Sequence, residues 1–344
     1  MAILKTFVSA LSLAAVGAAI PAHMHQRQNP PTTTLYSVTT ITQIVNAPAA
    51  TAPYSTTSNT KPNSQSTHDD DSESVSEAVT LPGVAYAPYR GDNGCKTPQQ
   101  VEEDLEQLKD KYGLIRIYGT DCDQVANIHD AAKKSGIKKL FLGIWNINDV
   151  ANEAQKIVDG IDGDWGMVDT VSVGNELVNN GAASSAQVIA AVKQARSILR
   201  GAGYNGPVVT VDTFVAVTAH PELCEASDYC AINAHAFFDS TITAEQAGAW
   251  LKKTVESVKS AVGGKKVVVT ESGWPHKGLS NGLAVPGSNQ QLEALTSIKK
   301  AFSNNLGDLI LFSAFNCPWK AINAATFDAE PYWGIDGLTA KSDI

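Results

Sequence analysis

The feature that most limits the possible folds is a regular alternation of short apolar runs with amphipathic stretches, which begins at Leu81. Short runs that are apolar at consecutive positions are typical of strands buried on both faces of a parallel sheet. Eight such runs are present, and we expect each of them to form a strand. They are Gly83–Ala87, Leu114–Tyr118, Lys139–Trp145, Val168–Val173, Val208–Val211, Tyr229–Asn233, Lys266–Thr270 and Leu309–Phe315.

The stretches between these runs carry helix start and stop signals. Four of them open on a capping box, in which Ser or Thr is followed three residues later by Gln. Pro98 adds a proline at the first helical position of the first stretch, and Gly201 and Gly263 stand where two helices are expected to stop. The four predicted boxes are Thr97 with Gln100, Ser184 with Gln187, Thr243 with Gln246, and Ser288 with Gln291.

Eight strand–helix units in residues 81–344 predict an α/β fold, the (β/α)8 TIM barrel, which typically takes about 250 residues. The alternative is an open doubly wound sheet. Such a sheet carries phosphate-loop glycines after its first strand, whereas this chain has Tyr86–Tyr89 there, so the barrel is favoured. In a barrel, the residues at the carboxyl ends of the strands form the active site.

The N-terminal 80 residues have a different character. Lys5 precedes an apolar run from Phe7 to Ile20, which is typical of a signal peptide, and we place this peptide at residues 1–22. The alternative is a membrane anchor, but the run is shorter than the roughly 20 residues that a span needs. We therefore expect a secreted, extracellular protein that is not embedded in a membrane.

Residues 23–80 are rich in Ser, Thr, Pro and Ala and end in an acidic patch from Asp69 to Glu77. This composition cannot bury enough apolar surface to fold alone, so we expect a disordered segment. Two interpretations stay open: an O-glycosylated spacer, or an unmodified pro-segment. The folded domain would then occupy residues 81–344.

The formal net charge of −9 gives no electrostatic reason to expect nucleic acid or an anionic membrane as a partner. A neutral polymer such as a polysaccharide is compatible with it. Because the chain has neither a Cys-x-x-Cys motif nor a His-rich cluster, we expect no metal and no cofactor. We expect the protein to act as a monomer.

Five cysteines are present, and disulfides are permitted in an exported chain. We expect Cys224 to pair with Cys230, because the two flank a short loop that enters the sixth strand. We expect Cys95 to pair with Cys122, because they follow the first two strands, which are neighbours in a barrel. Cys317 is left outside both pairs.

Two predicted strands lead directly into a glutamate. The fourth continues as Gly174, Asn175 and Glu176, and the seventh is followed by Glu271 and then by Ser-Gly-Trp-Pro. Two carboxyl groups that face one site are what glycosidic cleavage requires, since one gives a proton to the leaving oxygen and the other attacks the anomeric carbon or activates water. Asn175 can donate a hydrogen bond to a sugar hydroxyl beside the reacting carbon.

From Leu81 onward the chain resembles glycoside hydrolase family 17, the β-1,3-glucanase family, in its fungal cell-wall branch. The resemblance rests on the segments Gly83–Tyr89, Ile115–Cys122, Val173–Glu176 and Thr270–Pro275. It implies a barrel, a retaining mechanism, a β-glucan substrate and a place in or near the cell wall. It further implies that Glu176 is the general acid/base and Glu271 the nucleophile.

Sugar rings stack on aromatic side chains, so aromatic residues near strand ends are candidate substrate contacts. The chain departs from plant-type family members at Ala234–Phe238, where these usually carry tyrosines, so the details of the subsites differ. Each candidate can equally be core. The predicted substrate-binding residues are Tyr86, Tyr118, Asn175, His235, Phe237, Trp274 and Trp319.

Arg116 lies inside the second predicted strand, where a charge needs a partner. A pair with an active-site carboxylate and a structural ion pair both stay open. Three functions are also open: a β-1,3-glucan hydrolase acting within the chain or from its end, a transglycosylase using the same glutamates, and a glucan-binding wall protein. The two intact glutamates favour an enzyme.

Overall fold

The computed structural model describes residues 81–340, so the signal peptide and spacer predicted for residues 1–80 lie outside the described residues. Eight parallel strands form a closed barrel in sequence order, with β8 pairing back to β1. This topology confirms the predicted (β/α)8 barrel. The strands are β1 Gly83–Ala85, β2 Leu114–Arg116, β3 Lys139–Ile144, β4 Val168–Asn175, β5 Val208–Thr213, β6 Cys230–Asn233, β7 Val267–Ser272 and β8 Leu309–Leu311.

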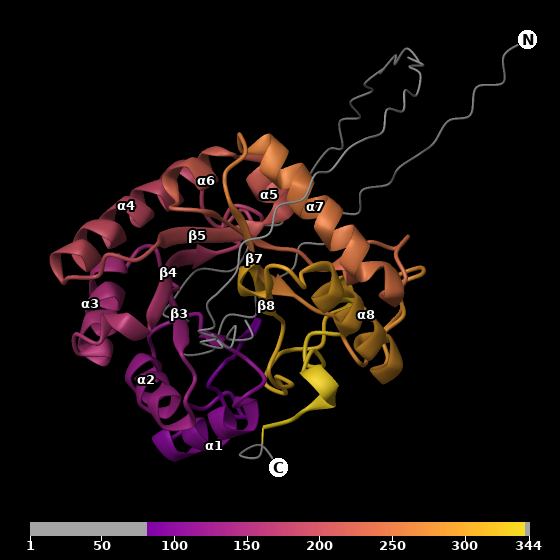
Figure 1. The fold of residues 1–344 in the computed structure, drawn as a ribbon, viewed down its shortest axis with the longest axis horizontal. Coiled ribbons are helices and arrows are strands. Elements are labelled where there is room, and N and C mark those ends of the chain that lie inside the picture. Colours follow the sequence, from indigo (N-terminus) through magenta and orange to yellow (C-terminus); the bar gives the residue numbers. More distant parts are fainter. Residues whose placement is uncertain (1–80, 341–344) are drawn as a thin grey trace, which may run out of the picture. The chain divides into compact units, whose positions relative to one another are not determined.

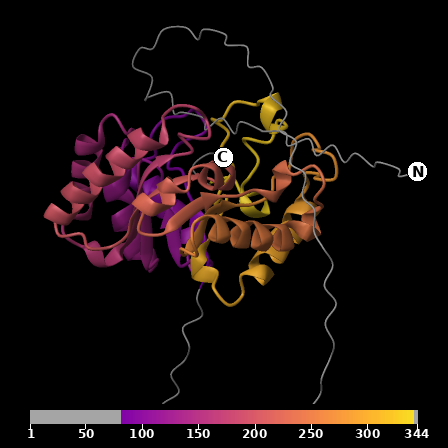
Figure 2. The ribbon, with the colours of Figure 1, turned by 90° about the horizontal axis from the view of Figure 1, so that it is seen from above.

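The helices lie outside the strands and surround the barrel (Figures 1 and 2). Two short helices follow β5, and after β8 the described chain contains only short 3₁₀ helices, at Ala324–Thr326 and Ile335–Gly337. Between residues 81 and 340, none of the helices combines the length and the apolar character needed to cross a lipid bilayer. The α-helices are α1 Pro98–Leu108, α2 Gln124–Ser135, α3 Val150–Ile161, α4 Ser185–Gly201, α5 Phe214–Ala219, α6 Glu222–Ala226, α7 Ala247–Ala261 and α8 Ser288–Ala301.

Three of the four predicted capping boxes are present. Those of Thr97 and Ser184 open α1 and α4, with each hydroxyl accepting a bond from the backbone N–H three residues on. That of Thr243 opens the 3₁₀ turn Ala244–Gln246, which runs directly into α7. These local signals therefore mark where the chain turns from a strand end into a helix.

The box predicted at Ser288 is wrong. Gly287 occupies the N-cap of α8, and no side chain caps this helix. The side chain of Gln291 instead donates hydrogen bonds to the backbone oxygens of Trp274 and Gly334, 2.9 and 3.1 Å away. Gln291 is thus a buried tie between α8 and the loops that follow β7 and β8.

The apolar core has two parts. The larger one packs the outward faces of the strands against the helices. The smaller one joins side chains from five different strands, which can touch only inside the barrel. Its members are Ala85, Phe141, Val209, Val211, Ala231 and Ile310. The barrel interior is therefore a filled core below the strand ends.

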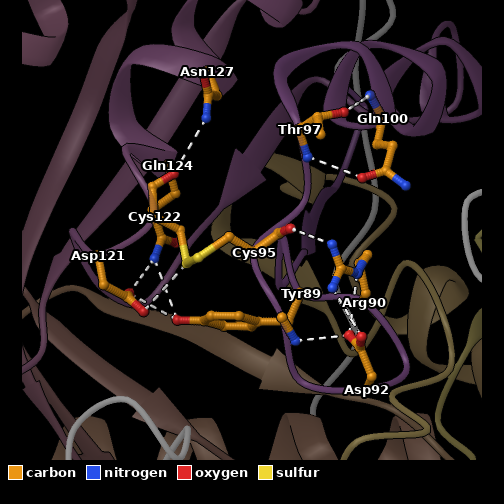
Figure 3. Close-up of a disulfide and its surroundings, with 11 residues drawn as sticks. Tyr89, Arg90, Asp92, Cys95, Thr97, Gln100, Asp121, Cys122, Gln124 and Asn127 are labelled. Atoms are coloured by element: carbon orange, nitrogen blue, oxygen red, sulfur yellow. Dashed lines mark hydrogen bonds and ion pairs between the residues drawn. A yellow bond between two sulfur atoms is a disulfide. The ribbon is translucent and has the colours of Figure 1, made fainter.

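Both predicted disulfides are present. Cys95 and Cys122 join the loops after β1 and β2, with their Cα atoms 5.4 Å apart (Figure 3). Beside the bridge, the Tyr89 hydroxyl donates to Asp121 at 2.8 Å, which ties the same two loops a second time. Cys224 and Cys230 are joined across the entry to β6, with Cα atoms 4.6 Å apart.

We expect the two bridges to contribute unequally to stability. Replacing Cys95 and Cys122 together by serine should lower the free energy of unfolding by about 3.5 kcal/mol, since the bridge closes a loop with a sequence separation of 27. The same change at Cys224 and Cys230, whose separation is 6, should cost about 2 kcal/mol. Urea unfolding of the two double variants measures both values, and the reverse order would contradict the loop-entropy account.

Candidate active site

The end of β4 is irregular, and this irregularity places Asn175 and Glu176. Successive residues of a regular strand point to opposite faces, so the two could not both face the barrel axis. The pairing of β4 with β5 shifts register between Ser172 and Asn175. Gly174 and Glu176 then adopt positive φ values of 75° and 56°. Such bulges re-aim side chains beside active sites.

Glu271 lies near the end of β7 and is 6% exposed. Its Oε1 accepts a 2.9 Å bond from Nη1 of Arg116 and a 2.8 Å bond from the hydroxyl of Tyr118. Its Oε2 lies 3.4 Å from Nε2 of His235. Residues from β2, from the loop after β2 and from the loop after β6 therefore hold this carboxylate from both sides.

Arg116, at the end of β2, is 1% exposed. Besides Glu271, its guanidinium donates to the Thr270 backbone oxygen at 2.8 Å, to Asn175 Oδ1 at 2.8 Å and to Asn233 Oδ1 at 3.3 Å. The structure thus shows that the partner of Arg116 is Glu271, one of the two candidate carboxylates. A buried ion pair with this many additional bonds is costly to break on one side only.

Glu176 is 3% exposed, and its Oε1 accepts a 2.9 Å bond from the Asn233 side-chain amide. The other end of Asn233 accepts from Arg116 and, at 2.8 Å, from the Thr270 hydroxyl. Glu176 and Glu271 are thus two ends of one chain of contacts that runs through Asn233 and Arg116.

The two glutamates differ in acidity. Burial, reinforced by the negative charge of Glu271, raises the pKa of Glu176 to about 8. Burial also acts to raise the pKa of Glu271, but Arg116, His235 and Tyr118 outweigh it and hold this pKa below its usual value. Near neutral pH the site therefore holds one protonated and one ionised carboxyl group, which is the pairing that acid-assisted nucleophilic displacement requires.

The substrate-binding residues predicted from the sequence differ in their surroundings. Tyr118, Asn175 and His235 all belong to the contact network around the two carboxyl groups. Trp319 is half-buried in the loop after β8, and its ring meets that of Tyr89 edge-on at 5.4 Å.

The other three predicted aromatic residues are buried in the structure. Trp274 and Phe237 are fully buried and pack edge-to-face at 5.4 Å, and the indole N–H of Trp274 donates to the Val285 backbone oxygen. Tyr86 is 2% exposed, and its hydroxyl donates to Asp104. All three belong to the larger apolar core and lie in the segments that follow β1, β6 and β7.

Sequence reasoning missed two polar residues of the site. Asn233 ends β6 and joins Glu176 to Arg116, and Asp212 near the end of β5 accepts bonds from the backbone that follows Glu176. Both lie at or near the carboxyl ends of barrel strands, where active-site residues are expected. The signal was therefore available, but neither residue stands in a recognised motif.

Comparison with known proteins places the chain in a known family. Residues 83–334 match the sequence profile of the BtgE/BtgC glycoside hydrolase domain. The chain belongs to this glycoside hydrolase family. The resemblance to glycoside hydrolase family 17 is also confirmed, because relatives that carry this family's name match over 256 residues.

Two fungal relatives illustrate the similarity. The chain is 44% identical to the cell surface mannoprotein MP65 of Candida albicans, over 74% of this chain and 66% of that protein. It is 45% identical to the probable family 17 glucosidase SCW4 of Saccharomyces cerevisiae, over 74% of this chain and 64% of the relative. The matched region thus spans just under two thirds of the length of each relative.

Solved structures share the fold. The crystal structure of a family 17 β-1,3-glucanosyltransferase from Rhizomucor miehei matches with a TM-score of 0.63 at 22% identity, covering 77% of this chain and 97% of that chain. An endo-laminarinase from Formosa matches with a TM-score of 0.61 at 17% identity, covering 74% and 82%. At these identities the comparison supports the barrel fold of the family and carries no information on substrate.

Proposed function

We propose that the chain is a secreted, retaining β-1,3-glucan hydrolase of the cell wall, in which Glu176 is the general acid/base and Glu271 the nucleophile. The observation that carries this proposal is the contrast between two buried carboxyl groups within one contact network. Glu176 carries a proton near neutral pH, and Glu271 is held ionised by Arg116. The glycosidase names of the relatives support the same reaction class.

In the first step, Glu271 attacks the anomeric carbon while Glu176 gives its proton to the leaving glycosidic oxygen. The bond to the leaving group breaks, and an ester bond forms between the sugar and Glu271. Arg116 and Tyr118 share Oε1 of Glu271, so the attacking lone pair comes from a carboxylate whose orientation is fixed. Asn175 is held by Arg116 at the position from which a ring hydroxyl can be bound.

In the second step, the now ionised Glu176 takes a proton from an acceptor, which attacks the same carbon and releases Glu271. Two inversions leave the anomeric configuration unchanged. When the acceptor is water the reaction is hydrolysis, and when it is another glucan the reaction is transglycosylation. Hydrolysis is the function proposed here, and transfer is the alternative that follows from the same intermediate.

A defined laminarioligosaccharide separates these outcomes. Incubation with the enzyme and chromatography of the products should give shorter oligosaccharides only. Longer products would identify a transferase instead, and an unchanged substrate would identify a glucan-binding protein. Matching incubations with a β-1,4-linked oligosaccharide test the proposed linkage.

The pH dependence of kcat/KM follows from the shifted pKa values of Glu176 and Glu271. The value of kcat/KM should fall at high pH with an apparent pKa of about 8, because Glu176 then loses the proton that it must donate. At low pH it should fall only below the usual glutamate range, because Glu271 stays ionised there. A profile measured with laminarin oligosaccharides between pH 3 and 10 should therefore be a broad bell. A high-pH limb near 4 to 5 would contradict the assignment of Glu176.

The cell-wall location and the single-subunit state belong to this proposal. One relative is named as a cell surface protein, which supports the location. Cell fractionation with immunodetection tests it, and sedimentation of the purified protein tests the monomer.

A further inference from the structure

The backbone at Glu176 adopts a conformation that its side chain does not favour. The φ value of 56° lies in the left-handed region, which is sterically unfavourable for a non-glycine residue. The N–H of Glu176 donates to the Val211 backbone oxygen at 2.9 Å, so β5 fixes the residue from one side. The turn that follows makes backbone bonds of its own, among them one from the Asn180 N–H to the Glu176 oxygen at 3.0 Å, and it also has a partner on β5.

That partner is Asp212. Its Oδ2 accepts a 2.9 Å bond from the backbone N–H of Val178, and its Oδ1 accepts a 3.2 Å bond from the backbone N–H of Asn179. Oδ1 also accepts from the N–H of Thr213 at 2.8 Å, and the Thr213 hydroxyl donates to the Asn179 side chain at 2.9 Å. Asp212 is 1% exposed, so these bonds form away from water.

The chemistry of this cluster favours an ionised Asp212. An ionised carboxylate has no proton to donate, and the three N–H groups offer only donors. Bonds from N–H groups to a carboxylate are about twice as strong as bonds between neutral groups. A carboxylate with both oxygens engaged therefore clamps the turn in a way that an amide side chain, with one acceptor oxygen, cannot reproduce.

We propose that Asp212 is a positioning residue for the general acid/base: it clamps the turn after Glu176 and so holds Glu176 in its left-handed conformation. This proposal rests on the role of Glu176 proposed above. Asp212 acts only through Glu176, since its contacts are with the backbone of the turn and of its own strand.

The groups around Glu176 and Asp212 shift the pKa values of these two carboxyl groups in both directions. Burial comes first in raising the pKa of Glu176, then the charge of Glu271 on β7; Asp212 on β5 adds to them, and Arg116 on β2 opposes them. The pKa of Asp212 itself is raised, because burial outweighs the three N–H bonds and His220, which follows α5 and also lowers this pKa. Removing the charge of Asp212 should accordingly move the pKa of Glu176 downward from about 8.

The test compares two substrates of the full-length enzyme. A 2,4-dinitrophenyl β-laminaribioside needs no proton on its leaving group, whereas a laminarioligosaccharide does. In Asp212→Asn, kcat/KM on the oligosaccharide should fall by about 30-fold, as expected from partial loss of general acid catalysis. On the dinitrophenyl substrate it should fall by less than about 3-fold, because glycosylation is then independent of the acid. The high-pH limb of the kcat/KM profile of Asp212→Asn on the oligosaccharide should move to lower pH.

Two further variants make the outcome decisive. Asp228→Asn is the matched control, because Asp228 accepts the backbone N–H of Val208 at the opposite end of β5 and should leave both substrates unaffected. Asp212→Glu keeps the charge and both acceptors but displaces them by one methylene, so it should show the same substrate contrast if Asp212→Asn does not fold. An equal fall of kcat/KM on both substrates overturns the proposal. A purely structural role lowers the amount of active enzyme, which leaves the ratio of the two kcat/KM values unchanged.

Glu176→Ala separates this proposal from the proposed function. It should show the same contrast between the substrates, only larger. If kcat/KM of Glu176→Ala falls equally on the oligosaccharide and on the dinitrophenyl substrate, the acid/base assignment itself fails. If it shows the contrast and the two Asp212 variants do not, only the role of Asp212 fails.

Discussion

Glu271→Ala is expected to abolish turnover of every substrate, whatever its leaving group. The variant lacks the group that forms the covalent intermediate, so even a dinitrophenyl glycoside gains nothing from its good leaving group. We expect a loss of roughly 10⁵-fold or more in kcat, the scale seen when a nucleophile is removed. Steady-state kinetics on both substrate types measure it, and retained turnover of the dinitrophenyl glycoside would contradict the assignment.

Glu176→Ala should behave differently from Glu271→Ala. It should still form the glycosyl intermediate from the dinitrophenyl substrate, but hydrolysis of that intermediate should be slow because water is no longer activated. Added azide needs no base, so it should restore turnover and give a β-glycosyl azide. Rescue of Glu271→Ala with a β-azide product would show that the two roles are exchanged.

The second large effect is expected at Arg116. Arg116→Met leaves Glu271 as a buried charge that has lost its strongest partner, and breaking a buried pair on one side costs about 3–5 kcal/mol. We also expect kcat to fall by roughly 10³-fold, because the carboxylate loses both its orientation and the positive charge that keeps it ionised. Urea unfolding and steady-state kinetics at pH 7 measure the two losses.

The stability loss at Arg116 should depend on pH. The folded pKa of Glu271 lies below its usual value, so its pairing with Arg116 stabilises the protein above the unfolded pKa and is lost as pH falls through the folded one. The difference between wild type and Arg116→Met should therefore be largest at neutral pH and should shrink in acid. Arg196→Met is a suitable control, since Arg196 donates to the backbone oxygens of Val208 and Ala226 outside the site. It should retain wild-type kcat.

The barrel was predictable from the sequence because strands buried on both faces leave apolar runs that recur between amphipathic helices. The ends of the strands were less predictable. The run Leu309–Phe315 was expected to be a strand throughout, but β8 ends at Leu311. Ala314 and Phe315 are as buried as the strand itself, so composition cannot distinguish a buried loop from a buried strand.

The two glutamates could be found from their position at strand ends, but the surroundings that set their acidities could not. Asn233 and Asp212 act on residues 57 and 34 positions away in the sequence, and no local pattern marks such contacts. The surroundings of Trp274 could not be predicted for a related reason. An aromatic ring beside a strand end can pack in the core or bind sugar, and only the fold shows that this one has no exposed face.

A covalent trap provides the most direct test of the proposed mechanism. A 2-deoxy-2-fluoro-β-laminaribiosyl fluoride should form the glycosyl intermediate and then react onward very slowly, because fluorine at C2 destabilises the positively charged transition states while fluoride remains a good leaving group. Intact-protein mass spectrometry should show one added fluoro-disaccharide, and peptide mapping should place it on Glu271. A label on Glu176, or an unlabelled enzyme whose natural products first appear as the α-anomer, would contradict the mechanism.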